Sequence, residues 1–176
     1  MAFLNSTINK IILILIISSV IFTGWQFGLE TGYARILVGV TNFSVSVFKS
    51  DTHIELEKIK NTDSYQFKVH TKIDGRKGSY PQETGGFMQP MVIVLSWQIF
   101  LFFVLDRKTV LRSMAVNIGV FLFFQVLFLA FLTGYYNSDV QQFLFDTMLD
   151  SFYIIALILV IKDNIFYSVF KKQINS

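Results

Sequence analysis

The run IILILIISSVIFTGWQFG, residues 11–28, is apolar over a length that matches a lipid bilayer. A helix that rises about 1.5 Å per residue needs about 20 residues to cross the hydrocarbon layer, which is about 30 Å thick. Three further runs of similar character lie at roughly 87–105, 114–133 and 143–161. The 176 residues are 53% hydrophobic and 15% charged, a composition typical of membrane proteins. We therefore expect an α-helical membrane protein with four transmembrane helices.

The first apolar run has the features of a retained anchor. It follows Lys10 and ends close to Trp25, a residue type enriched at membrane interfaces. Its apolar core is longer than that of a typical signal peptide, and no convincing small-x-small cleavage site follows it. We predict an N-terminal transmembrane anchor at 1–28, a segment outside the membrane at 29–86, and three further transmembrane helices with a C-terminal tail at 87–176.

Positive charges beside the apolar runs predict the orientation. The segment 106–113 between the second and third runs contains three basic residues, whereas 135–142 between the third and fourth contains none. The basic residues are Arg107, Lys108 and Arg112 in the first of these segments, and Lys10, Lys162, Lys171 and Lys172 near the two ends. Basic residues in short loops favour the cytoplasmic side. We therefore expect both termini to be cytoplasmic and residues 29–86 to be extracytoplasmic.

The extracytoplasmic segment contains a pattern typical of β-structure. In SYQFKVHTKID, residues 64–74, strand-favouring side chains alternate with polar ones. The stretch 52–60 is separated from it by the turn-forming residues 61–64, so the two predict a β-hairpin. The stretch 43–48 also alternates, and it fits either a third strand or the continuation of an amphipathic stretch that leaves the membrane. Residues 75–86 are rich in Gly, Pro and Ser and predict a flexible return loop.

The two histidines of the chain, His53 and His70, fall on the two strands of this hairpin. They would face each other, and Glu55 nearby would complete a surface metal site. Histidines within alternating polar residues more often belong to a solvated face. We favour that interpretation, and we expect neither a metal site nor a cofactor.

The fourth run carries two carboxylates, Asp146 and Asp150, which lie one turn apart on a helix. A charged side chain at the bilayer centre costs roughly 2.5 to 3.5 kcal/mol on insertion scales. A wet cavity, protonation, or a nearby cation would offset this cost, and Arg35 is the nearest cation by depth. The pair is then structural, contacts a partner protein, or takes part in proton or substrate chemistry. Arg35 itself fits an interfacial belt with Tyr33; the alternative is an external binder of anions or carboxylates.

Polar residues also occur in the second and third runs. They are Trp97 and Gln98 in the second, and Asn117 and Gln125 in the third. Such groups need partners in lipid, and hydrogen bonds between helices supply them. We therefore expect these residues to help to pack the helices into a bundle.

Several functions are disfavoured by what the sequence lacks. Because there is no Cys, disulfides, thiolate metal sites and cysteine nucleophiles are excluded. No Walker loop, GxGxxG turn, HExxH motif or nucleophile elbow is present, so we expect no enzymatic activity. The net charge of +3 comes without a basic stripe interleaved with aromatic residues, which favours membrane lipids over nucleic acid as the electrostatic partner.

The layout of the chain resembles a family of small membrane proteins encoded beside exosortases, especially the exosortase H-associated type. The residues that carry the resemblance are the Phe-x-x-Trp element at 22–25, the Val-x-Thr element at 69–71, the Pro-headed second run at 90–96 and the two further spans. The resemblance implies an accessory protein of the bacterial inner membrane that works with a sorting transpeptidase on proteins with C-terminal sorting helices. Exosortases use Cys, Arg and His, so a chain without Cys is not that enzyme, and no catalytic residues carry over.

We therefore expect a non-catalytic accessory subunit that binds another integral membrane protein, for which an exosortase is the candidate, in protein sorting, export or envelope assembly. The alternative is a component of a transporter or channel in which Asp146 and Asp150 line a polar path, although the two halves of the chain show no inverted repeat. A third hypothesis has the least support. It is a membrane enzyme that acts on lipid-linked substrates through Asp146, Asp150 and Arg35.

Overall fold

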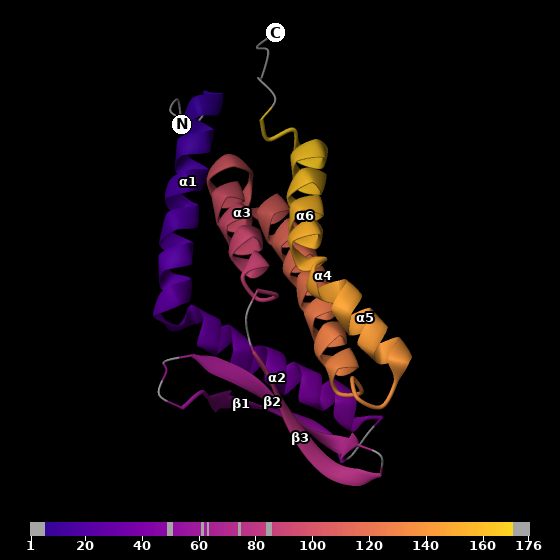
Figure 1. Ribbon diagram of the computed structural model, residues 1–176. Coiled ribbons are helices and arrows are strands. Elements are labelled where there is room, and N and C mark those ends of the chain that lie inside the picture. The colour runs from indigo at the N-terminus through magenta and orange to yellow at the C-terminus, as the bar shows by residue number, and fades with distance from the viewer. Residues whose placement is uncertain are drawn as a thin grey trace. The chain divides into compact units, whose positions relative to one another are not determined.

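The computed structural model describes residues 6–48, 51–60, 62, 64–73, 75–83 and 86–170. These residues form α1 (Thr7–Gly24), the π-helix η2 (Trp25–Leu29), α2 (Glu30–Ser46), β1 (His53–Lys58), β2 (Tyr65–Ile73), β3 (Arg76–Glu83), α3 (Pro90–Val104), α4 (Arg107–Leu132), α5 (Asp139–Leu149) and α6 (Phe152–Tyr167) (Figure 1). The predicted class of a mostly helical chain with a small sheet is confirmed.

The chain divides into two compact units, which are described separately. The helical unit comprises Met1–Phe27, Pro90–Phe121 and Tyr153–Ser176. The sheet unit comprises Gly28–Gln89 and Leu122–Phe152.

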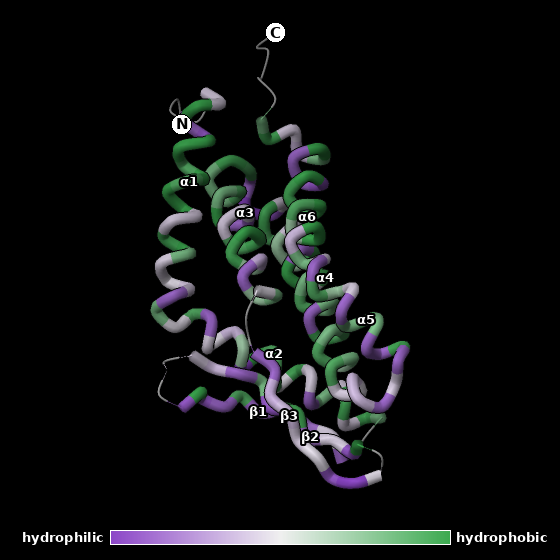
Figure 2. The backbone as a smooth tube through the Cα atoms, in the orientation of Figure 1, coloured by the Kyte–Doolittle hydropathy of each residue, from purple (hydrophilic) through white to green (hydrophobic). Residues whose placement is uncertain are grey.

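Apolar residues dominate α1, α3, α4 and α6, whereas the strands are mostly hydrophilic (Figure 2). Among the described residues, two helical segments, Thr7–Ser46 and Arg107–Leu132, are long and apolar enough to cross a membrane. The interrupted pair α5 and α6 adds a third if it forms one broken span. Helix α3 has 15 residues, a length of about 22 Å, which is less than a full crossing. The count of four crossings therefore stays a prediction.

In the helical unit, the start of α1, the turn between α3 and α4, and the end of α6 lie at the same end (Figure 1). Lys10 Nζ donates to the carbonyl oxygen of Val169 at 2.5 Å. Ile17, Leu101, Val110 and Val169 belong to one buried apolar cluster. The described basic residues that predicted a cytoplasmic side therefore gather at one end of this unit, while Lys171 and Lys172 lie outside the described residues.

In the sheet unit, three antiparallel strands follow the order β1-β2-β3. The predicted hairpin of β1 and β2 is confirmed. The alternation of apolar and polar residues in β2 places its apolar side chains on one buried face. Phe67, Val69 and Thr71 are buried, because successive side chains of a strand point to opposite faces. Helix α2 is tied to the sheet by Asn42, whose side chain makes two 2.8 Å hydrogen bonds with the backbone of Ile54.

The third strand comes from the segment predicted as a return loop, so that prediction is wrong. Strand β3 pairs only with β2, and an edge strand tolerates a proline such as Pro81. The ring of Tyr80 packs edge-on against Tyr136, and its hydroxyl donates to the carbonyl oxygen of Leu132. The stretch 43–48, for which strand and helix were both open, forms the end of α2 up to Ser46.

Two of the predicted helix boundaries are also wrong. The predicted loop 106–113 is helical from Arg107 onward, because Asp106 Oδ2 accepts a 2.9 Å hydrogen bond from the Thr109 backbone N–H and caps the first turn. This hydrogen bond holds the pKa of the Asp106 carboxyl below its usual range. The predicted continuous run 143–161 is interrupted at 150–151, between α5 and α6.

Candidate functional site

Among the described residues, the buried carboxylate of Asp163, on α6 in the helical unit, collects the largest group of side-chain donors. Asp163 is completely buried. Its Oδ2 atom lies within hydrogen-bond distance of four side-chain donors. They are Trp97 Nε1 at 3.1 Å and Gln98 Nε2 at 3.2 Å from α3, and Ser113 Oγ at 2.8 Å and Asn117 Nδ2 at 2.6 Å from α4. We call these five residues the Asp163 cluster; it connects α3, α4 and α6.

The neighbouring Lys162 supplies the opposite charge. Its Nζ lies 3.2 Å from Asp163 Oδ1 and donates to Asn117 Oδ1 at 2.5 Å. The contact with Asp163 is an ion pair without hydrogen-bond geometry, so Oδ1 itself accepts no hydrogen bond. A buried carboxylate is tolerated where opposite charge and several donors replace the water it has lost. No solvent reaches this carboxylate, and the cluster therefore acts as a structural connection between helices.

The sequence analysis predicted partners for Trp97, Gln98 and Asn117, and the structure brings all three to the same acceptor. It missed the acceptor, because Asp163 follows the last predicted apolar run and was counted with the tail. One signal could have found it. Two adjacent runs, each with side-chain donors and no acid of its own, require a nearby acceptor, and the only acids at that end of the runs are Asp106 and Asp163.

Gln125, in the part of α4 that belongs to the sheet unit, has a second internal connection. Its Oε1 accepts a hydrogen bond from the Tyr33 hydroxyl of α2, and its Nε2 donates to the carbonyl oxygen of Phe87 at 2.9 Å. Phe87 is buried, and its ring packs against Phe128 with centroids 4.7 Å apart. Gln125 and Asn117 are thus both satisfied inside the chain, as predicted for polar residues of packed helices.

Asp146 and Asp150 are placed differently. Asp146 lies in α5, Asp150 follows its last residue, and both side chains are exposed. Within the described part of the chain, neither carboxylate has a side-chain hydrogen bond or an ion pair, and Arg35 is exposed and forms no ion pair with either. Large apolar side chains on the same helix are exposed beside them, among them Val140 at 66% and Phe143 at 67%.

An apolar cavity of about 410 Å³ lies in the sheet unit between α2 and α4. Val45 of α2 and Phe123, Leu127 and Ala130 of α4 contribute to its lining. Its walls carry no charged residue, so its lining is suited to apolar groups and has no acid or base for chemistry.

The two histidines face each other across the hairpin, as the sequence analysis predicted. His53 is the register partner of His70, and their rings stack with centroids 4.6 Å apart. Glu55 lies close to both, at 3.3 Å from His53 Nε2 and 3.5 Å from His70 Nε2. This is the only group of three metal-ligating side chains that the described residues bring together.

Comparisons of the chain with protein-family models, with curated proteins and with solved structures gave no match. The described residues define a mostly helical chain with two apolar helical segments of membrane-spanning length and a small antiparallel sheet.

Proposed function

We propose that this chain is a non-catalytic, multi-pass subunit of the bacterial inner membrane that binds another integral membrane protein through α5. The observation that carries the proposal is the contrast among the polar residues of the apolar segments. Asn117, Gln125 and Asp163 have partners inside the chain, whereas Asp146 and Asp150 are exposed beside exposed apolar side chains and have none among the described residues.

A carboxylate pair on an apolar helix face is costly in lipid, and a partner that supplies donors or a cation would remove the cost. It also gives specificity, because a helix without the matching groups would leave the two acids desolvated and unpaired. The resemblance to exosortase-associated proteins makes an exosortase the first partner to test.

In the proposed topology, both termini are cytoplasmic and the sheet is extracytoplasmic. It is supported by the gathering of Lys10, the α3 to α4 turn and the end of α6 at one end of the helical unit. The positive-inside rule assigns that end to the cytoplasm.

Photocrosslinking from position 143 in native membranes tests the proposal, because Phe143 is exposed on α5 beside Asp146 and leaves both acids in place. We expect a photoreactive residue at 143 to capture one integral membrane protein, and the Asp146→Asn substitution to reduce the yield strongly. A photoreactive residue at 166 replaces Phe166, which is 75% exposed on α6; it is the control outside α5 and should give less product.

The same partner should co-purify in mild detergent with the wild-type chain and much less with the Asp146→Asn/Asp150→Asn variant, at equal protein levels. Equal recovery of the partner with both forms would contradict the proposal. Flux of a solute in reconstituted vesicles that requires the two acids would instead favour the transporter hypothesis.

A further inference from the structure

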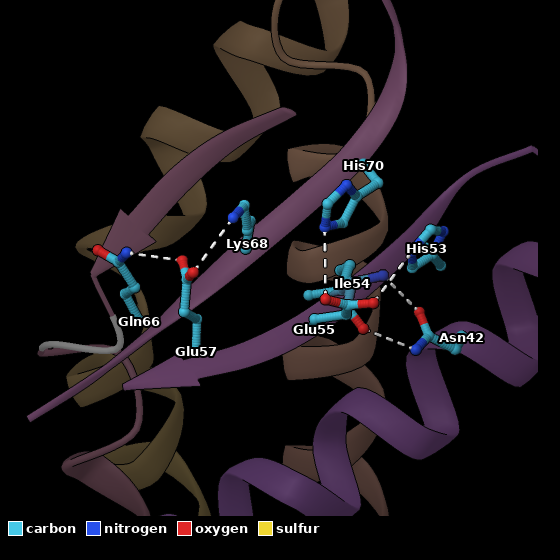
Figure 3. A network of polar contacts seen from close by, with 8 residues as sticks. All are labelled: Asn42, His53, Ile54, Glu55, Glu57, Gln66, Lys68 and His70. Carbon is cyan, nitrogen blue, oxygen red and sulfur yellow. Dashed lines mark hydrogen bonds and ion pairs between the residues drawn. The ribbon is translucent and has the colours of Figure 1, made fainter. Parts of the chain in front are cut away.

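The exposed face of the hairpin carries three side chains that converge on one point. His53 and Glu55 are two residues apart on β1 and therefore project from the same face, and His70 is opposite His53 on β2. Figure 3 shows both imidazoles directed toward the Glu55 carboxylate. All three donor atoms lie within 4.8 Å of one another. The arrangement supplies two imidazole nitrogens and a carboxylate, the ligand set of many zinc sites.

The donor atoms lie near the separations of a metal site, with each histidine opposite a different oxygen of Glu55. Zinc bonds of about 2.0 to 2.1 Å in tetrahedral geometry place neighbouring donor atoms about 3.4 Å apart. Glu55 Oε1 lies 3.3 Å from His53 Nε2, and Glu55 Oε2 lies 3.5 Å from His70 Nε2. The Nε2 atom of His70 is shielded from solvent and has no hydrogen bond, so it is left with an unused lone pair or proton beside the carboxylate.

The lysines near His53, Glu55 and His70 pair with other carboxylates, so Glu55 interacts with the two histidines. Lys68 is the register partner of Glu55, but its Nζ bonds to Glu57 at 3.1 Å instead (Figure 3). The hydrogen bonds from Lys68 and Gln66 hold the pKa of the Glu57 carboxyl below its usual range. On the other side of His70, Lys72 Nζ forms an ion pair with Asp51 Oδ2 at 2.5 Å. Both lysines beside His70 on this face are thus neutralised by other carboxylates.

The backbone that carries the three side chains is fixed. Asn42 binds both the N–H and the carbonyl oxygen of Ile54, the residue between His53 and Glu55 (Figure 3). Strand β2 is the central strand, so His70 is held on both sides, by β1 and by Ser79 of β3. A metal site whose ligands are held before binding loses little conformational entropy when the ion enters.

We propose that His53, Glu55 and His70 form a binding site for a divalent transition metal, with Zn²⁺ as the expected ion. The side chains of His53 and Glu55 are 52% and 60% exposed, so an ion enters from their side and reaches the shielded Nε2 atom of His70 past them. Three protein ligands leave a fourth position open for water or for a group of another molecule. Mg²⁺ is a poor fit, because it prefers oxygen ligands in octahedral geometry.

The test uses the full chain in detergent, freed of any polyhistidine tag, titrated with ZnCl₂ by calorimetry. We expect one Zn²⁺ per chain. Even the outer partners of a metal ligand are worth about 10- to 100-fold in affinity, so His70→Gln and Glu55→Gln should each weaken binding at least tenfold. Glu83→Gln, which removes an exposed carboxylate of β3 opposite Gln66 on the same face but outside the site, is the matched control and should bind as the wild type does.

Two further measurements keep the result interpretable. Circular dichroism of each variant in EDTA should match the wild type, and His53→Gln, at the exposed start of β1, is a second ligand variant if His70→Gln fails to fold. Co²⁺ should give the intense visible absorption of a tetrahedral site in the wild type and in the control variant, but not in the ligand variants. Absence of Zn²⁺ binding to the wild type, or equal binding to the His53→Gln/His70→Gln variant, would overturn the proposal.

Discussion

Two sets of carboxylates on apolar helices differ in how their charge is compensated. Asp163 is completely buried, with four side-chain donors on one oxygen and Lys162 beside the other. Asp146 and Asp150 are exposed and, among the described residues, have no such donors. The contrast indicates two uses of an acid in an apolar segment. An acid surrounded by internal donors stabilises the fold, and an acid without them is available to something outside the chain.

The largest effect is expected when the enclosed acid is removed. The Asp163→Ala substitution leaves the donors of the cluster without their shared acceptor and Lys162 without its opposite charge, and breaking a buried charged network typically costs about 3 to 5 kcal/mol. The free energy of unfolding in mixed micelles, from an SDS titration, measures the loss. Asp146→Ala is the control on the exposed side, and similar losses for the two substitutions would remove the distinction between them.

A smaller loss is expected at Gln125, which has neutral partners. Gln125→Ala removes the hydrogen bonds to the Tyr33 hydroxyl and to the Phe87 carbonyl oxygen, which should cost about 1 to 3 kcal/mol in the same titration. The exposed Gln142 is the comparison residue, and its replacement by Ala should change stability by less than about 0.5 kcal/mol. If the two substitutions lower the free energy of unfolding by the same amount, the hydrogen bonds of Gln125 do not stabilise the fold.

Asp106 is a third case: its carboxylate is exposed, and its charge is stabilised by a hydrogen bond from a backbone N–H. Its pKa is lowered by the hydrogen bond from Thr109. This contribution to stability is therefore fully present above the pKa of the unfolded chain, and it is lost as the pH falls through the lower pKa of the folded chain. We expect Asp106→Ala to be less stable than the wild type at neutral pH, with a difference that shrinks in acid. A difference independent of pH would contradict the capping role.

The smallest effect on stability is expected at the exposed pair. Because Asp146 and Asp150 lose no internal contact, the Asp146→Asn/Asp150→Asn variant should unfold within about 0.5 kcal/mol of the wild type, although it should lose its partner. The same SDS titration measures the stability. A loss comparable to that of Asp163→Ala would show that these acids stabilise the fold after all.

The elements that could be predicted from the sequence are those with a regular pattern of apolar and polar residues. The apolar runs predicted α1, α3 and α4 and, as one uninterrupted helix, α5 with α6, whereas α2 lies outside them. The alternation in 64–74 predicted β2 and its buried face. Strand β3 could not be predicted this way, because Gly78 and Pro81 are typical of loops. It forms because β2 offers an edge and because Tyr80 packs against Tyr136. These are contacts between distant residues, and a local pattern does not contain them.

The contacts of the histidine group and of Asp163 could be predicted only in part, because they too depend on contacts between distant residues. The hairpin predicted from the sequence allowed His53 and His70 to face each other, and the strand register places them opposite each other. That Lys68 pairs with Glu57 and not with Glu55 depends on side-chain conformation. The break at 150–151 lacks the Gly or Pro that usually marks one. The sequence pattern places Asp163 in a polar tail, whereas in the structure α6 continues to Tyr167.

We propose that the strands are extracytoplasmic and that the basic residues at the start of α4 are cytoplasmic. The chain has no Cys, so a single introduced cysteine reports its own compartment. We predict that Lys77→Cys in β3 reacts with a membrane-impermeant maleimide in intact spheroplasts, and that Lys108→Cys at the start of α4 reacts only after permeabilisation. Labelling of both positions on the same side of the membrane would contradict the account.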